Sequence, residues 1–180
     1  LVPGGSGFIG SHLCKKVAER GIEFIVFDIK KPNFECKFFK GDVRSLQNLL
    51  KAIEEGDEVI HLAALVNAHE SNKRKEEYFD VNVKGTFNVV RACELKSAEK
   101  IIFASSVAIF DPNLEGTLNE NAKKKPQNFY GLTKLVGEEL VVHSALNSVV
   151  LRFTNVYGKG GVGVVNKFIE KALKNEPLEI

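Results

Sequence analysis

The sequence predicts an α/β protein with an open, doubly wound parallel sheet. Three observations lead to this fold class. Short apolar runs alternate with segments of helical period along the chain, a glycine-rich turn follows the first run, and an aspartate closes the second. This alternation favours β-α units, whose right-handed crossovers wind parallel strands into a sheet with helices on both faces.

The apolar runs and turn residues predict the order of the elements. Strands are expected at residues 1–2, 24–27, 36–39, 58–64, 100–104 and 148–153. Helices are expected from the glycine turn to Arg20, after a Ser45 cap, over about 71–96, over 129–144 and over about 164–174. A loop rich in Asn, Lys, Gly and Pro is expected over about 111–128.

The composition narrows the function classes. Hydrophobic residues make up 44% and charged residues 27% of the chain, as in ordinary soluble globular proteins. A net charge of +2 predicts no nucleic-acid partner and no anionic membrane surface, and no apolar run reaches the about 18 residues of a membrane span. Three separated cysteines and four histidines without ligand spacing predict neither a disulfide framework nor a metal site, with the reducing cytoplasm as the default location.

Both ends of the sequence predict a piece of a longer protein. The chain contains no methionine, and only two residues precede a glycine-rich turn that should follow a full strand. At the other end, residues 178–180 look like the start of another strand.

The glycine-rich turn is typical of a dinucleotide site. Gly4, Gly7 and Gly10 form a GxxGxxG pattern, and residues 5–10 also satisfy GxGxxG. Glycine lets the backbone approach a pyrophosphate, and the following helix presents free N–H groups to the phosphates. The alternative is a glycine turn with no ligand; the strand before it and the helix after it favour the dinucleotide.

Asp28 ends the second expected strand, close to the spacing at which a carboxylate binds the adenosine ribose. A carboxylate there accepts the ribose hydroxyls and repels a 2′-phosphate, which favours NAD over NADP. Lys30 and Lys31 count against this preference, because either could pair with a 2′-phosphate.

Ser106, Tyr130 and Lys134 are the candidate catalytic residues. Tyr130 and Lys134 are four residues apart on an expected helix and therefore share a face, while Ser106 follows the fifth expected strand, where such folds bind ligands. A tyrosine of ordinary pKa, about 10, is a poor base. The Lys134 ammonium and an oxidised nicotinamide would favour the phenolate, so that Tyr130 removes a hydroxyl proton while Ser106 holds the reacting oxygen. The alternative for the Tyr-Lys pair is a solvated helix face.

With these residues in place, the chain resembles the extended short-chain dehydrogenase/reductase family of NAD-dependent nucleotide-sugar epimerases and dehydratases, typified by UDP-glucose 4-epimerase. The matching blocks cover nearly the whole chain in order. They are GGSGFIGSHL (4–13), Asp28, GDV (41–43), HLAA (61–64), NVKGT (82–86), SS (105–106), YGLTK (130–134), LR (151–152) and NVYG (155–158).

The resemblance implies a Rossmann-type NAD domain over residues 1–156 and the start of an incomplete substrate-binding domain over 157–180, the rest of that C-terminal domain being absent. Asp42 and Val43 would flank the adenine, Asn82 and Phe153 would lie by the nicotinamide, and Asn155 would contact the substrate diphosphate. The full set of expected cofactor contacts is Gly4, Gly7, Phe8, Ile9, Gly10, Asp28, Asp42, Val43, Leu62, Ala63, Ala64, Asn82, Tyr130, Lys134 and Phe153. Ser106, Tyr130 and Asn155 are the expected substrate contacts. For His61 and Asn82, simple packing is the alternative.

Three departures from the family pattern bear on function. Pro3 replaces the usual Thr, for which the sequence gives no reason. Val107-Ala108 stands where dehydratases carry an Asp-Glu pair, which argues against 4,6-dehydration. Phe110-Asp111 replaces a Tyr-Gly pair and is expected to reshape the sugar pocket.

The function expected from these residues is NAD-dependent 4-epimerisation of a nucleotide sugar by transient oxidation at C4. A one-way dehydrogenase or reductase acting on a sugar or sterol-like alcohol is the related alternative. A non-catalytic NAD-binding sensor or scaffold is the alternative of another class; its mark would be loss of Tyr130 or Lys134, and both are present. The family also implies a homodimer through the helices expected at about 71–96 and 129–144.

Overall fold

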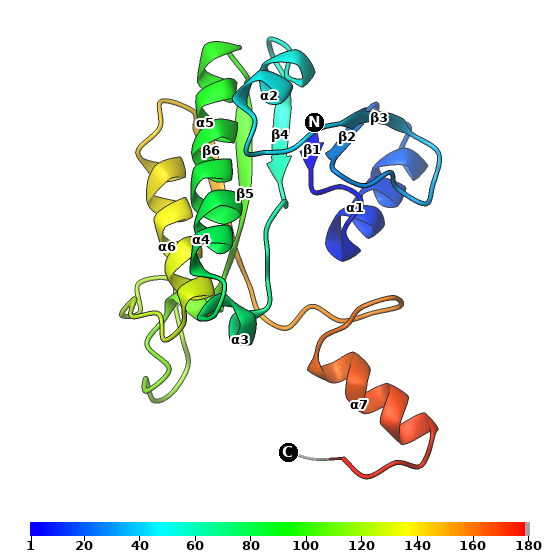
Figure 1. Cartoon of the computed structure of the whole chain (residues 1–180), viewed down its shortest axis with the longest axis vertical. Coiled ribbons are helices and arrows are strands. Elements are labelled where there is room, and N and C mark those ends of the chain that lie inside the picture. The colour runs from blue at the N-terminus through cyan, green and yellow to red at the C-terminus, as the bar shows by residue number, and fades with distance from the viewer. Residues whose placement is uncertain (179–180) are drawn as a thin grey trace.

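The computed structural model describes residues 1–178 and shows an α/β fold with helices on both faces of a parallel sheet (Figure 1). In chain order the elements are β1 (Val2–Pro3), α1 (Phe8–Glu19), β2 (Ile25–Asp28), β3 (Lys37–Lys40), α2 (Leu46–Ala52), β4 (Glu58–His61), α3 (Ala68–Ser71), α4 (Lys75–Tyr78), a π-helical turn (Phe79–Lys84), α5 (Gly85–Leu95), β5 (Lys100–Ser106), a 3₁₀ turn (Val107–Ile109), α6 (Phe129–Val142), β6 (Asn147–Phe153) and α7 (Val164–Leu173).

The strands form two three-stranded parallel sheets, in the orders β1-β2-β3 and β4-β5-β6. The Ile60 N–H donates to the Leu1 carbonyl at 2.9 Å and the Leu62 N–H to the Pro3 carbonyl at 2.8 Å, which joins β4 to β1. The combined order is therefore 3-2-1-4-5-6, that of a Rossmann-type doubly wound sheet. Pro3 gives this central strand a carbonyl acceptor but no N–H donor.

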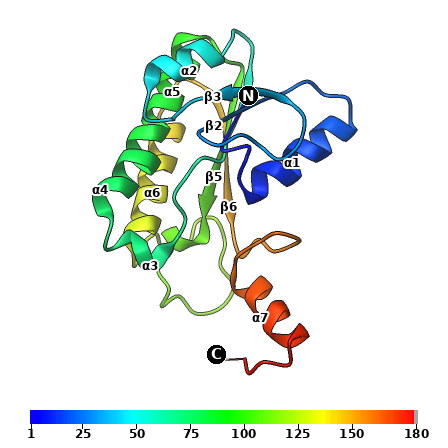
Figure 2. The ribbon, with the colours of Figure 1, turned by 45° about the vertical axis from the view of Figure 1, so that its right-hand side comes forward.

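Helices α2, α5 and α6 cover one face of the sheet and α1 the other, as Figure 2 shows. The larger core cluster lies under α2, α5 and α6 and includes Phe27, Leu49, Val89 and Phe103. A smaller cluster of Val2, Cys14 and Val26 lies under α1. Helix α7 stands apart below the sheet (Figures 1 and 2). Within residues 1–178 no helix is both long and apolar enough to cross a membrane.

Most of the predicted elements are confirmed to within one or two residues, including the Ser45 cap, whose side chain accepts from the Asn48 N–H. Strand β4 was predicted too long. It ends at His61, because beyond it the backbone of Leu65 pairs with the Asn82 side chain instead of a strand. The strand predicted at 178–180 falls at the edge of the described residues: Leu178 is irregular, and 179–180 lie outside them.

The helix predicted over 71–96 is confirmed from Lys75 to Leu95, where α4, the π-helical turn and α5 follow one another without a break. Its predicted start is wrong, because residues 72–74 form a turn that separates α4 from the short helix α3. Asn67 caps α3, accepting from the backbone N–H groups of His69 and Glu70, and the π-helical turn carries the buried Asn82. Strand β5 was predicted too short. It continues to Ser106, because Ser105 and Ser106 pair with Arg152 and Phe153 of β6.

Candidate active site

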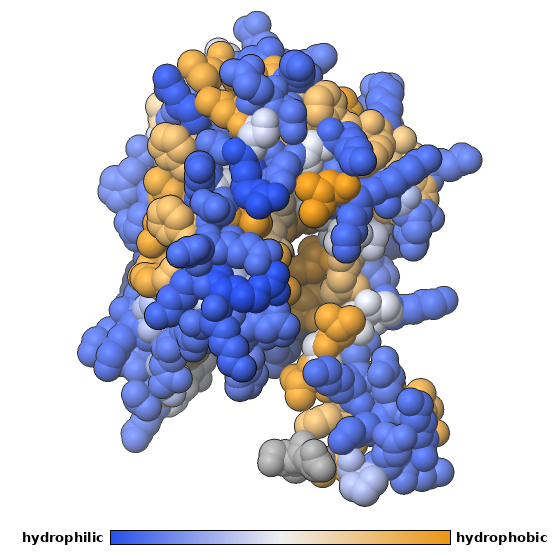
Figure 3. All heavy atoms as spheres, in the orientation of Figure 1, coloured by the Kyte–Doolittle hydropathy of each residue, from blue (hydrophilic) through white to orange (hydrophobic). Residues whose placement is uncertain are grey.

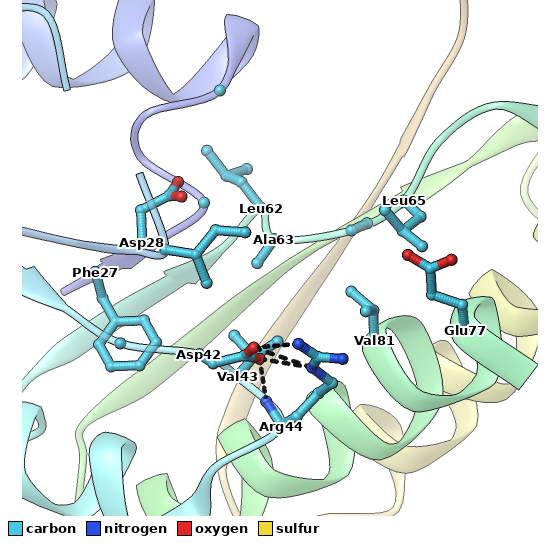
Figure 4. Close-up of a pocket in the computed structure, with 15 residues that line it drawn as sticks. Phe27, Asp28, Asp42, Val43, Arg44, Leu62, Ala63, Leu65, Glu77 and Val81 are labelled. Atoms are coloured by element: carbon cyan, nitrogen blue, oxygen red, sulfur yellow. Dashed lines mark hydrogen bonds and ion pairs between the residues drawn. The ribbon is translucent and has the colours of Figure 1, made fainter. Parts of the chain in front are cut away.

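A pocket of about 260 Å³ opens beside the carboxyl ends of β1, β2, β3 and β4 (Figure 4). Several of the predicted cofactor residues line it: Gly4, Gly7, Asp28, Asp42, Val43, Leu62, Ala63 and Ala64. Sequence reasoning missed its remaining lining residues, which are Phe27, Ile29, Gly41, Arg44, Leu65, Glu77 and Val81. The predicted contacts Phe8, Ile9 and Gly10 lie at the start of α1, behind the turn.

The glycine turn has no room for side chains. Gly4 has a φ of +87°, and a Cβ atom built on it would lie 2.4 Å from the Ala63 nitrogen. A Cβ on Gly10 would lie 2.4 Å from the Gly4 carbonyl oxygen. Gly7 caps α1 without a side-chain hydrogen bond, so the first N–H groups of the helix point to the turn free of a side-chain acceptor. A backbone cradle of this kind, backed by a helix N-terminus, fits a pyrophosphate.

The Asp28 carboxylate is held in place by backbone groups. Its two oxygens accept from the Ser6 N–H at 3.1 Å and from the Lys30 N–H at 3.0 Å. The Ser6 hydroxyl in turn donates to the Lys30 carbonyl at 2.6 Å, which fixes the glycine turn to the end of β2. Asp28 therefore presents an oriented anion at the pocket wall.

Asp42 forms an ion pair with Arg44 on the pocket floor (Figure 4). The Arg44 Nη2 lies 2.6 Å from the Asp42 Oδ2, and Nε contacts both carboxylate oxygens. The hydrogen bonds from Arg44 lower the pKa of Asp42, although partial burial raises it. Arg44 was visible in the sequence only as one more basic residue, two positions beyond the predicted adenine contact.

The second group of candidate residues lies where β5 and β6 end. Ser106 and Phe153 are direct partners across these two strands. Tyr130 lies in the first turn of α6, which Asn128 caps by accepting from the Gly131 N–H at 2.8 Å. A Cβ on Gly131 would come within 2.3 Å of the Ala108 carbonyl oxygen, so glycine allows this turn to pack against the 3₁₀ turn that follows β5.

The first turn of α6, which carries Tyr130, packs through Gly131 on the 3₁₀ turn that Ser106 caps. Burial raises the pKa of Tyr130, whereas hydrogen bonding with the Ser106 side chain lowers it in part, and the nearby Tyr78 adds a small increase. Lys134 does not contribute to this balance, so its predicted effect on the phenol is not seen in this structure.

Lys134 instead points into the protein. Its side chain donates to the Ala104 carbonyl at 2.8 Å and lies 5.0 Å from the centre of the Phe103 ring, and the residue is 4% exposed. Burial lowers the pKa of Lys134 to about 8. Lys134 thus lies one helical turn beyond Tyr130 on α6, and its ammonium contacts β5 near the carboxyl end of that strand.

His61 and Asn82 are packed inside the protein. The His61 Nε2 lies 3.0 Å from the Thr86 hydroxyl, and burial followed by the Lys134 charge lowers the pKa of His61 to about 3. The Asn82 side chain bonds both backbone groups of Leu65 and donates to the Thr133 hydroxyl. Asn82 therefore links the segment after β4 to α6.

Asn155 is the predicted residue that remains apart from these groups. It is exposed, two residues beyond β6. The segment that follows it returns to the first turns of α1: the His12 Nε2 contacts the Lys159 carbonyl at 2.9 Å, and a Cβ on Gly161 would meet the Phe8 ring.

Comparison with known proteins agrees with this geometry. The UDP-glucose 4-epimerase of Rhizobium meliloti is 31% identical and matches 100% of this chain and 58% of its own length. A human sterol-4-alpha-carboxylate 3-dehydrogenase is 34% identical over 78% of the chain and 38% of its own length. The structure of Thermus thermophilus UDP-glucose 4-epimerase in complex with NAD superposes with a TM-score of 0.87 at 31% identity, covering 98% of this chain and 63% of that one.

The chain thus spans less than two thirds of the length of these relatives. The family model that describes the NAD-dependent epimerase/dehydratase family matches residues 1–180. The fold, the glycine cradle and the family match agree with the resemblance found in the motifs, and the chain belongs to the NAD-dependent epimerase/dehydratase family.

Proposed function

We propose that the protein carrying this chain is an NAD-dependent 4-epimerase of a nucleotide sugar. The observation that carries the proposal is that the first turn of α6, which carries Tyr130, packs on the turn that Ser106 caps, at the same edge of the sheet as the glycine cradle. Relatives named UDP-glucose 4-epimerase, with similarity over the full chain, support the sugar class.

The first half of the sheet supplies what the dinucleotide requires. The cradle at Gly4 and the start of α1 would hold the pyrophosphate, and Asp28 would accept the hydroxyls of the adenosine ribose. The apolar wall formed by Leu62 and Ala63 suits the flat rings of the cofactor. When bound, the oxidised nicotinamide would accept a hydride from an alcohol carbon and return it, so that the alcohol is oxidised to a ketone and reduced again.

Tyr130 is proposed to take the proton from the sugar C4 hydroxyl and give it back after the sugar has turned. The Ser106 hydroxyl would hold the same oxygen and stabilise the charge that develops on it. Because burial raises the pKa of Tyr130, the phenolate needs a nearby positive charge. The Lys134 ammonium has three protons and donates one to Ala104, so it can also hold a ribose hydroxyl beside the phenol.

Replacing the phenol tests this assignment. We expect Tyr130→Phe to lower kcat by about 10²–10⁴-fold, the usual contribution of a general acid-base group. The assay is epimer formation by the full-length protein with a panel of UDP-, GDP- and dTDP-sugars. The exposed Tyr157 provides a matched control, and Tyr157→Phe should retain activity. Unchanged turnover of every accepted sugar by Tyr130→Phe would leave a non-catalytic NAD-binding role.

Asp28 tests the cofactor. We expect Asp28→Ala to weaken NAD binding by about 10- to 100-fold, as for a lost charged hydrogen bond, and to narrow the discrimination against NADP. Calorimetry measures both affinities, with Asp57→Ala as the control. If the ratio of NAD to NADP affinity stays at its original value, another group reads the ribose.

A one-way dehydrogenase is the second candidate, because the human sterol dehydrogenase is 34% identical over most of the chain. The two reactions differ in their cofactor balance. An epimerase returns the hydride and leaves the absorbance of reduced cofactor near zero, whereas a dehydrogenase accumulates it in proportion to product.

The outer faces of α5 and α6 support a homodimer. A groove of about 430 Å³ runs between these helices and is lined by Phe87, Val90, Val136 and Leu140 among others. Apolar surface lies along this edge of the molecule (Figure 3), where Phe87 is 51% and Val142 60% exposed. Pairing two copies through this face would bury it. Light scattering should give twice the protomer mass for the original protein and a single protomer mass for Phe87→Glu.

A further inference from the structure

Glu138 is a buried carboxylate that the proposed mechanism does not use. It lies one turn beyond Lys134 on α6, and its side chain is 2% exposed. The Ser105 hydroxyl donates to Oε1 at 2.5 Å, and the Arg152 Nε and Nη2 donate to Oε1 and Oε2, both at 2.9 Å. Ser105 and Arg152 are direct partners across β5 and β6. The carboxylate therefore joins the catalytic helix to both strands beneath it.

Arg152 extends the same network into the 111–128 loop. Its Nη1 donates to the Glu120 carbonyl at 2.7 Å, and its guanidinium lies 5.2 Å from the centre of the Phe110 ring. Lys124, at the other end of the loop, pairs with Phe110 as an isolated antiparallel bridge and lies 3.5 Å from the Glu138 carboxylate. Phe110 therefore lies under the arginine that holds the loop, which gives the unusual Phe110-Asp111 pair a structural role.

Stability alone does not explain this arrangement. A buried ion pair is often no more stabilising than a well-packed apolar pair of similar volume, because both ions must be desolvated. Its hydrogen bonds are directional, however, and an apolar contact is not. Burial raises the pKa of Glu138, but the hydrogen bonds from Arg152 and Ser105 lower it by more, so its pKa lies below the ordinary value. The carboxylate therefore stays ionised and keeps accepting hydrogen bonds from both strands.

The contacts of the helical turn that ends at Glu138 show how these bonds hold α6 against β5. Lys134 bonds Ala104, Gly137 is so close to Phe103 that a Cβ would meet its ring at 2.6 Å, and Glu138 bonds Ser105. Three consecutive residues of β5, from Phe103 to Ser105, thus contact α6 between Lys134 and Glu138. A shift of the helix along the strand would move the Tyr130 phenol away from Ser106, the last residue of β5.

We propose that the Glu138–Arg152 pair is a positioning device, which sets α6 on β5 so that Tyr130 stays beside Ser106 and which ties the 111–128 loop to the same frame. Glu138 and Arg152 are positioning residues, because they act through Tyr130 and Ser106. The catalytic readout of this inference rests on the proposed function.

The test compares Glu138→Gln and Arg152→Lys with the original full-length protein. Both variants keep a polar side chain, but one removes the negative charge and the other removes the paired donor geometry. We expect kcat to fall by about 100-fold, the effect of displacing a reacting group by about 1 Å, with KM changing much less. Glu139→Gln is the matched control, since Glu139 is the next residue, is 53% exposed and also lies near Lys124.

Two measurements do not depend on turnover. Limited trypsin digestion followed by mass spectrometry should show cleavage after Lys123 and Lys124 about ten times faster in both variants, because the loop has lost its anchor. Ultraviolet titration of the phenols, with Tyr130→Phe as the subtraction, should show a shifted pKa for Tyr130. If a variant does not fold, Ser105→Ala removes one bond to Glu138 and should give the same changes to a smaller degree.

The proposal is overturned if the variants only lower the melting temperature while kcat, the trypsin cleavage rate and the Tyr130 titration keep their original values. Absence of turnover by the original protein with every nucleotide sugar would instead contradict the proposed function. The digestion and the phenol titration would then still decide whether Glu138 and Arg152 position the helix and the loop.

Discussion

The two halves of the sheet build their parts of the site in different ways. The β1-β2-β3 half uses backbone: Gly4 leaves space for the chain itself, and main-chain N–H groups hold Asp28. The β4-β5-β6 half uses buried polar side chains, with Lys134 at 4%, Glu138 at 1% and Asn82 at 2% exposure.

Because of this difference, we expect the two halves to be sensitive to different kinds of substitution. Near the cradle, adding a single carbon causes a clash with fixed backbone. Near Tyr130, removing a polar atom leaves its partner buried without a hydrogen bond, which typically costs about 1–3 kcal/mol. Exposed charges in either half should matter much less.

The largest effect is expected at the cradle. Gly4→Ala places a Cβ 2.4 Å from the Ala63 nitrogen at a φ of +87°, so the turn must shift. A clash and left-handed strain together cost about 3 kcal/mol, and we expect NAD affinity to fall by about 100-fold. Calorimetric titration measures it. Gly163→Ala, where the nearest atom is 3.8 Å away, is the control. Equal affinities for both variants would show that the turn does not hold the cofactor.

A smaller effect with a particular pH dependence is expected at Lys134. The fall of its pKa from 10.5 to about 8 corresponds to a cost of about 3 kcal/mol for keeping the buried ammonium charged at neutral pH. Lys134→Met removes this cost but leaves the Ala104 carbonyl without its donor, so we expect a net gain in stability of about 1 kcal/mol, together with loss of activity.

The pH dependence distinguishes this from ordinary packing. Between about pH 8 and 10.5 the unfolded original chain binds a proton on Lys134 that the folded chain does not, so its stability should rise with pH. Lys134→Met should lack this rise, as measured by denaturant unfolding at several pH values. Parallel curves for the two proteins would mean that the ammonium is well solvated.

The smallest effect is expected for the ion pair in the pocket. The Arg44 and Asp42 side chains are 50% and 29% exposed, so Arg44→Ala should change the free energy of unfolding by less than about 1 kcal/mol. In this variant the pKa of Asp42 should rise towards its ordinary value. In the original protein the pKa of Asp42 is lowered, so the small stabilisation from the pair is lost as the pH falls through that folded-state pKa. Carboxyl NMR titration measures this shift. A large loss of stability would remove the contrast with Glu138.

Local patterns predicted the glycine turn, Asp28 and the Tyr130–Lys134 spacing, because each depends on residues close together in the chain. Pocket residues such as Arg44 and Glu77 were missed, since neither carries a local signal that separates it from other surface charges. The break before Lys75 and the π-helical turn within the helix expected over 71–96 were missed for a similar reason. The helical period was read correctly, but the π-helical turn carries Asn82, whose side chain bonds Leu65 and Thr133, and both of these residues lie outside the helix.

The sequence by itself determined the parallel α/β order and the glycine turn, because helical period and glycine placement depend on backbone sterics over short stretches of chain. The ordered motif blocks along the chain determined the family. The tertiary structure alone decided that Lys134 faces Ala104, that Glu138 and Arg152 join three elements, and that Phe110 lies beneath Arg152. These contacts connect residues far apart in the chain, and their geometry depends on how helices dock on the sheet.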